Sequence, residues 1–121
     1  MIDDVKVIHG SILESNKIEM YDLAMVIGVL IHIAPKYLPL AYENIYRATR
    51  RYILIGEYYS RQPEEVLYRG YKNKLFKRDF AGEMLDKYTD LRLVDYGFFY
   101  HKDESSKLDD ITWFLMEKAD I

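Results

Sequence analysis

The stretch "DLAMVIGVLIHIAPKYLP" (Asp22–Pro39) joins an apolar run to a segment that opens on a proline, with His32 between the two. Residues Leu23–Ile31 are apolar except for one glycine, and a run of this length predicts a strand covered on both faces, as in parallel sheets. From Pro35 onward, apolar residues recur at spacings of three and four, which predicts an amphipathic helix. The apolar stripe of this helix is Leu38, Ala41, Ile45 and Ala48. The stretch therefore predicts an α/β protein with a histidine where a strand turns into a helix.

Working outward from this stretch, short β-branched or apolar runs predict four further strands. These are Val5–Leu13, Arg51–Tyr59, Leu91–His101 and Asp109–Lys118. Asp79 is expected to cap a helix over Phe80–Tyr88. We interpret Glu14–Asp22 as a connector and Ser60–Arg78 as a loop with short helical pieces. The order of elements predicts one α/β domain over residues 1–121.

Composition excludes several classes of protein and site. The net charge of −3 argues against nucleic-acid binding, and the absence of cysteine excludes disulfides and thiolate metal sites. The histidines at 9, 32 and 101 have no ligand spacing, so no metal site is predicted. No apolar run is long enough to cross a membrane and no signal peptide is evident, so we expect a cytoplasmic protein.

The order of these segments resembles the carboxy-terminal half of a class I S-adenosylmethionine-dependent methyltransferase. The resemblance is strongest to the small-molecule branch associated with pseudaminic-type sugar biosynthesis. The residues that carry it are "YDLAMVIGVLIHIAP" (21–35), "RYILIGEYY" (51–59), "YRGYKNKLFKRDFAGEML" (68–85) and the closing "LRLVDYGFFYH" and "DDITWFLMEK". "VKVIHGSIL" (5–13) resembles the third strand of that family. The resemblance implies part of a Rossmann-like sheet, with parallel strands, a C-terminal antiparallel pair and helices on the faces.

The resemblance also implies S-adenosylmethionine as the donor, together with residues that would touch it. In this family a glycine-rich turn and an acidic residue hold most of the donor. The six glycines of this chain never fall at a G-x-G spacing, so we expect a truncated domain that binds the donor weakly or not at all by itself, and is inactive or incomplete alone. The positions that match secondary donor contacts are Gly10, Ser11, Ile12, Ile27 and Gly28. Ser11 departs from the acidic residue common at its place, which weakens adenine recognition.

His32 and the end of the following strand provide the candidate residues for chemistry on an acceptor. An imidazole at the carboxyl end of a strand can take a proton from an acceptor hydroxyl, and the alternative is a structural histidine that closes the turn. Glu57 could accept hydrogen bonds from the hydroxyls of a sugar-like molecule. Tyr58 or Tyr59 could stack on a sugar ring, and the alternative is packing against the neighbouring helix.

Basic residues after this strand provide a candidate anion site. Arg69 and Lys77 belong to a basic run that could receive the carboxylate or phosphate of an acidic sugar. A solvated charged surface is the alternative interpretation of the same run.

Partners follow from the sheet that the resemblance implies. The inner edge of Leu23–Ile31 would lack its neighbours, and bare apolar edges pair with other strands. Three solutions are open: Val5–Leu13 moves beside it, two copies pair edge to edge, or a separate polypeptide supplies the missing half. The resulting hypotheses are a methyltransferase for a small acceptor, or a non-catalytic remnant that serves binding or oligomerisation.

Overall fold

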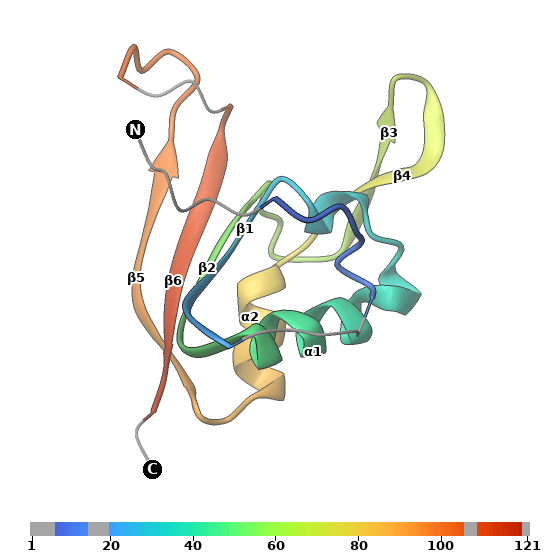
Figure 1. Cartoon of the computed structure of the whole chain (residues 1–121). Coiled ribbons are helices and arrows are strands. Elements are labelled where there is room, and N and C mark those ends of the chain that lie inside the picture. The colour runs from blue at the N-terminus through green and yellow to red at the C-terminus, as the bar shows by residue number, and fades with distance from the viewer. Residues whose placement is uncertain (1–6, 15–19, 106–108, 120–121) are drawn as a thin grey trace.

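The computed structural model describes residues 7–14, 20–105 and 109–119. The elements in these ranges are β1 (Tyr21–Ile27), η1 (Leu30–His32), η2 (Pro35–Tyr37), α1 (Leu38–Ala48), β2 (Thr49–Glu57), β3 (Glu64–Tyr68), β4 (Tyr71–Lys77), α2 (Phe80–Lys87), β5 (Leu91–Phe99) and β6 (Ile111–Lys118). β1, β2, β5 and β6 form one sheet, and β3 and β4 form a separate hairpin (Figure 1). None of the described helices is both long and apolar enough to span a membrane.

The larger sheet has the order β1-β2-β6-β5. β1 and β2 run parallel, and β6 is antiparallel to both β2 and β5. The predicted sheet with parallel strands and a C-terminal antiparallel pair is therefore confirmed. Within the described ranges β1 is an edge strand, because no strand pairs with its other side.

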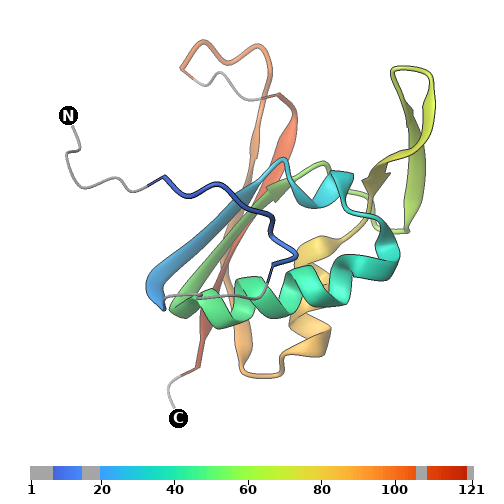
Figure 2. The same cartoon turned by 45° about the vertical axis from the view of Figure 1, so that its right-hand side comes forward.

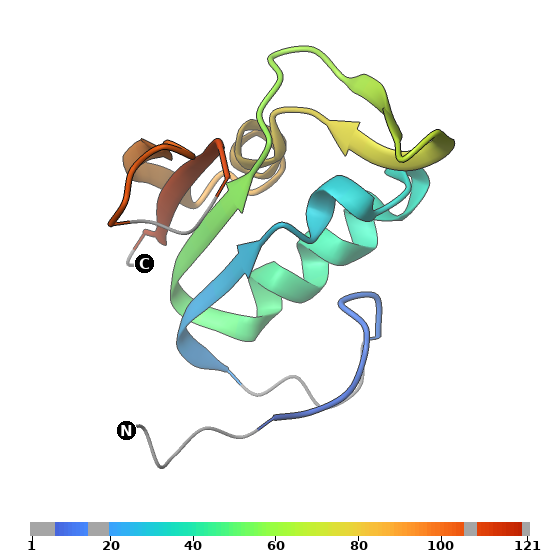
Figure 3. The same ribbon diagram turned by 90° about the horizontal axis from the view of Figure 1, so that it is seen from above.

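Both α-helices cover the same face of this sheet, which we call the inner face (Figures 1 and 3). Side chains alternate along a strand, so register assigns Ile53, Ile55 and Met116 to this face, where each is at most 1% exposed. They pack with Ala41 of α1 and Met84 of α2, which are both fully buried. The core of the protein thus lies between one face of the sheet and two helices.

The opposite face of the sheet, which we call the outer face, is covered by no described helix (Figure 3). Its members come from β1, β2 and β6 and share the register that alternates with the inner face. They are Leu23, Met25, Ile27, Leu54, Trp113 and Leu115. Leu23 is 46% and Met25 61% exposed, and the other four are half-buried.

The structure corrects two predicted segments. Residues 7–14 form no strand, although Val5–Leu13 was predicted as one; residues 5 and 6 lie outside the described ranges. A strand needs a neighbour for its hydrogen bonds, and the described residues provide none here. Instead Asn44 Nδ2 donates to the Ile12 carbonyl at 2.7 Å and to the Glu14 carbonyl at 3.2 Å. The segment is thereby held against α1, towards which it descends in Figure 2.

Ser60–Arg78 is the second correction, because it contains an antiparallel hairpin where a loop with helical pieces was predicted. The turn residues Arg69 and Gly70 have φ of 51° and 80°, and two consecutive left-handed residues match the twist of a two-residue hairpin turn. The hairpin stands out from the body, while its second strand, β4, packs against η1 (Figure 1).

The other boundaries differ less. β1 ends at Ile27, four residues before the predicted end, because Gly28 takes a left-handed φ of 69° and Leu30 and Ile31 turn into the core. The capping role of Asp79 is confirmed, since its Oδ1 accepts from the Gly82 amide at 2.9 Å.

The outer face gives a graded test of the sheet register. A Cβ at Gly97 would lie 2.6 Å from three atoms of the Trp113 ring, whereas at Gly56 its nearest neighbour would be Ile27 Cγ1 at 3.3 Å. We expect Gly97→Ala to lower the free energy of unfolding by about 1–3 kcal/mol, as overpacking does. Gly56→Ala is the control, with a smaller loss because aliphatic side chains can shift. Urea unfolding measures both, and an equal loss in the two variants would contradict the register.

Candidate functional site

The carboxyl ends of the parallel strands β1 and β2 lie side by side and lead into η1 and into residues 58–60 (Figure 2). Ligands of open α/β sheets bind beyond such ends. The residues predicted to act on an acceptor follow these two strands, His32 after β1 and Glu57 to Tyr59 at the end of β2. This end of the sheet is therefore the candidate functional site.

Glu57 fixes the turn that follows β1. The side chain is only 3% exposed, and its Oε2 accepts from the amides of Val29 at 3.1 Å and Leu30 at 3.2 Å. Oε1 accepts from the Ile31 amide at 3.3 Å. These amides open η1 and have no partner within it, so the carboxylate takes the place of an N-terminal cap. The hydrogen bonds of Glu57 to a ligand stay a prediction, because the bonds present here are to the protein's own backbone.

Burial raises the pKa of Glu57 to about 7, which outweighs the opposing effects of the three amides and of the charge of His32. His32 is itself exposed at the end of η1 and is near enough to Glu57 to interact with it electrostatically. A buried carboxyl that titrates near neutrality beside an exposed imidazole is a common feature of functional sites.

The two tyrosines take different surroundings. Tyr58 Oη donates to Asp109 Oδ2 at 2.6 Å, and the same bond lowers the pKa of that carboxyl. Lys77 Nζ lies 5.6 Å from the centre of the Tyr58 ring. Tyr59 is 45% exposed and packs on Phe114 with 6.0 Å between the ring centres. The structure therefore brings Tyr58 and Lys77 together and leaves much of the Tyr59 ring open to solvent.

The predicted anion-binding residues are separated. Arg69 lies at the tip of the hairpin and Lys77 at its base, beside a hollow of about 180 Å³. Prolines and charged side chains line this hollow, namely Pro35, Pro63, Glu64, Glu65, Phe76, Lys77 and Arg78. Arg78 donates from Nε to Glu83 at 2.6 Å, and Glu83 also accepts from the Tyr42 hydroxyl at 2.7 Å. Arg69 and Lys77 thus do not form one site in this structure.

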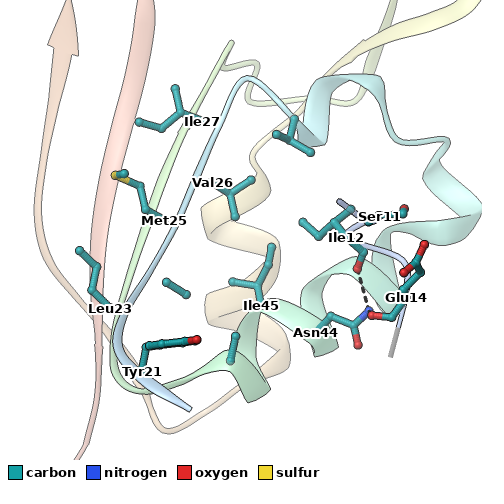
Figure 4. Close-up of a pocket in the computed structure, with 14 residues that line it drawn as sticks. Ser11, Ile12, Glu14, Tyr21, Leu23, Met25, Val26, Ile27, Asn44 and Ile45 are labelled. Atoms are coloured by element: carbon teal, nitrogen blue, oxygen red, sulfur yellow. Dashed lines mark hydrogen bonds between the residues drawn. The ribbon is translucent and has the colours of Figure 1, made fainter. Parts of the chain in front are cut away.

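Most of the predicted donor contacts do meet. Gly10, Ser11, Ile12 and Ile27 line a hollow of about 660 Å³ between β1, α1 and residues 10–14 (Figure 4). Its volume is within the range of about 300–1,000 Å³ found for small-molecule sites. Gly28 lies just beyond this lining, where its amide donates to the Gly56 carbonyl at 2.9 Å.

Asn44 is the residue of this hollow that sequence reasoning missed. It is 5% exposed, and its amide nitrogen ties residues 12 and 14 to α1 while Oδ1 has no hydrogen-bond partner among the described residues. A polar residue directly before Ile45 on the apolar stripe of α1 is the signal that could have identified it. No group of His, Asp and Glu side chains in the described ranges could hold a metal ion.

The raised pKa of Glu57 predicts a pH-dependent stability. The folded protein keeps its proton up to about pH 7 and the unfolded chain loses it near 4.5, so stability is full at low pH and falls as pH rises between these values. Against Glu57→Gln, whose side chain does not titrate, the wild type should lose about 2–3 kcal/mol between pH 5 and pH 8. Urea unfolding at both pH values measures this. Glu43→Gln on exposed α1 surface is the control, and a pH-independent difference at position 57 would refute the assignment.

No protein-family model and no curated protein sequence matches this chain. Solved structures do match. One is Burkholderia thailandensis 1,6-didemethyltoxoflavin-N1-methyltransferase with bound 1,6-didemethyltoxoflavin and S-adenosylhomocysteine, with a TM-score of 0.68 and 15% identity over 90% of this chain and 48% of that one. Another is a SAM-dependent methyltransferase of Leishmania major, with a TM-score of 0.61 and 13% identity over 88% of this chain and 43% of that one.

The chain thus spans less than half the length of either structure. Likeness at this level of identity establishes a fold and not an activity. The chain has part of the Rossmann-like fold of class I S-adenosylmethionine-dependent methyltransferases.

Proposed function

We propose that this chain supplies the acceptor side of an S-adenosylmethionine-dependent methyltransferase that acts on a small, sugar-like molecule of the pseudaminic type. The observation that carries the proposal is the meeting of His32 and Glu57 at the carboxyl ends of two parallel strands, in a fold shared with methyltransferases. The predicted cytoplasmic location belongs to the same proposal.

The residues present suit only part of the donor. Gly10, Ser11 and Ile12 give the hollow beside β1 a wall of backbone and small side chains, which fits the edge of a flat heterocycle. The chain has no G-x-G turn to offer paired backbone amides to the rest of the molecule. We infer that the donor is held mainly by groups outside this chain.

S-adenosylmethionine, when bound, supplies a methyl group on a sulfonium sulfur. As the acceptor oxygen gains this methyl group, the sulfur keeps the electron pair of the broken carbon–sulfur bond and the hydroxyl releases its proton. His32 takes that proton as general base. Glu57 positions His32, because its three backbone hydrogen bonds hold η1 in place.

The exposed ring of Tyr59 and the Tyr58–Asp109 pair are next to this position in the chain and fold. We propose that the Tyr59 ring stacks on the apolar face of a sugar ring, and that Lys77 attracts an acidic group of the acceptor. Arg69 at the hairpin tip would reach the acceptor only if the hairpin bent towards η1, so Lys77 is the stronger candidate.

A non-catalytic module remains the second candidate, and the exposed edge of β1 favours it. Titration calorimetry with S-adenosylmethionine tests the division of the donor site. We expect no micromolar binding to this chain by itself, because the groups that hold most of the donor lie elsewhere. Micromolar binding would refute the incomplete site and would favour a self-sufficient enzyme.

Methyl transfer itself is tested in the source cells with methyl-labelled donor. Deleting the gene should remove label from a sugar-containing small-molecule fraction, and the wild-type gene should restore it. His32→Ala should restore about 100-fold less, as the loss of a general base does. His101→Ala is the control, because this exposed histidine pairs with Asp110 away from η1. Unchanged label in the deletion strain would leave the non-catalytic module as the better explanation.

A further inference from the structure

The edge of β1 and the outer face beside it form one continuous apolar surface. Leu23 and Met25 belong to both, because they stand on the edge strand and point away from α1 and from Val26 (Figure 4). Register continues this surface through Leu54 of β2 to Leu115 of β6. Met20, Leu23 and Met25 are 57%, 46% and 61% exposed. Adjoining apolar side chains this exposed mark an interaction site.

The hollow beside β1 has the form of a strand site. Its lining includes Tyr21 at the start of β1, continues from Leu23 to Ile27, and ends at Val29 beyond the strand (Figure 4). The hollow therefore follows β1 along its whole length. The opposite wall is formed by residues 10–14, which Asn44 holds against α1. A hollow of this shape fits an extended chain better than it fits a compact molecule.

A second copy of the chain fits this surface poorly. Two identical β1 edges related by a two-fold axis would run antiparallel and would only lengthen the sheet. Leu54, Trp113 and Leu115 would stay uncovered, because the outer face is perpendicular to such an interface. The edge and the outer face need an occupant that covers both.

We propose that a strand–helix unit of a separate polypeptide docks here, with its strand parallel to β1 in the hollow and its helix on the outer face. Parallel strands are joined by crossovers that place helices on the sheet faces, so a parallel neighbour of β1 brings its own helix to the uncovered side. The matching structures are about twice as long as this chain, which leaves room for such a unit in the shared fold. That the unit also carries the donor-binding turn rests on the proposed function.

The surface specifies the chemistry of the helix. Its apolar part ends at Glu117, which accepts from Arg51 at 2.8 Å and from Arg92 at 3.0 Å. A helix lying over Leu23, Met25 and Leu54 needs an apolar stripe there and polar side chains where it passes this charged group. The hollow offers one more contact, since Asn44 Oδ1 is a buried acceptor that a donor of the incoming strand could satisfy.

The test places the photoreactive amino acid p-benzoylphenylalanine at position 25 of the chain, expressed in its source cells. We expect light to join position 25 to one other polypeptide, in a segment that forms a strand followed by an amphipathic helix. The same amino acid at position 67, which is 64% exposed on the hairpin, should give no such product. A product with a second copy, or no product at position 25, would overturn the proposal.

The identified partner is then mixed with the purified chain and the complex is measured by native mass spectrometry. Leu23→Glu with Met25→Glu should abolish the complex, and Leu67→Glu should leave it intact. Circular dichroism confirms that each variant folds, as expected for exposed positions. A complex that survives the double substitution would also overturn the proposal. Calorimetry with S-adenosylmethionine on the complex tests the proposed function separately, so docking without donor binding would refute that function and leave the docking site supported.

Discussion

The parallel pairing of β1 with β2 is the constraint on which the candidate site depends. It brings the two carboxyl ends to the same edge of the sheet, and the Glu57 carboxylate then binds the three amides that follow β1. Without that carboxylate, three backbone donors would be left in a buried turn, each at a cost of about 1–3 kcal/mol. Sheet direction and a single side chain together place His32.

The two faces of the sheet are unequal, and this difference explains the shape of the molecule. Ile53, Ile55 and Met116 are buried under two helices, so the inner face alone supplies a core. The outer face keeps large apolar side chains, including Leu23 and Met25, in contact with solvent. Half-covered apolar sheets of this kind are usual where another layer packs, because an α/β sheet is normally covered on both sides.

Local signals in the sequence predicted much of this fold. The periodicity of α1, the cap at Asp79 and the two closing strands each follow from residues close together in the chain, and each is confirmed. The hairpin was missed because its basic residues suggested a loop, although Arg69 and Gly70 between β-prone residues carried the turn signal. Residues 7–14 were wrongly assigned because strand propensity does not supply a neighbouring strand.

The candidate site was less predictable because its interactions are long-range. Glu57 meets amides 26 to 28 residues earlier in the chain, and Asn44 meets carbonyls about 30 residues earlier. Sequence pattern indicated that a carboxylate ends β2, but not which donors would surround it. The four residues gathered in the hollow beside β1 were predicted through resemblance, and only the fold could show that they face the same space.

The chain has a single tryptophan, and Trp113 lies on the outer face with its ring over Gly97. Indole emission moves to shorter wavelength when water around the ring is replaced by apolar side chains. The protein thus contains a built-in fluorophore that reports, without labelling, whether its uncovered layer is wet or dry.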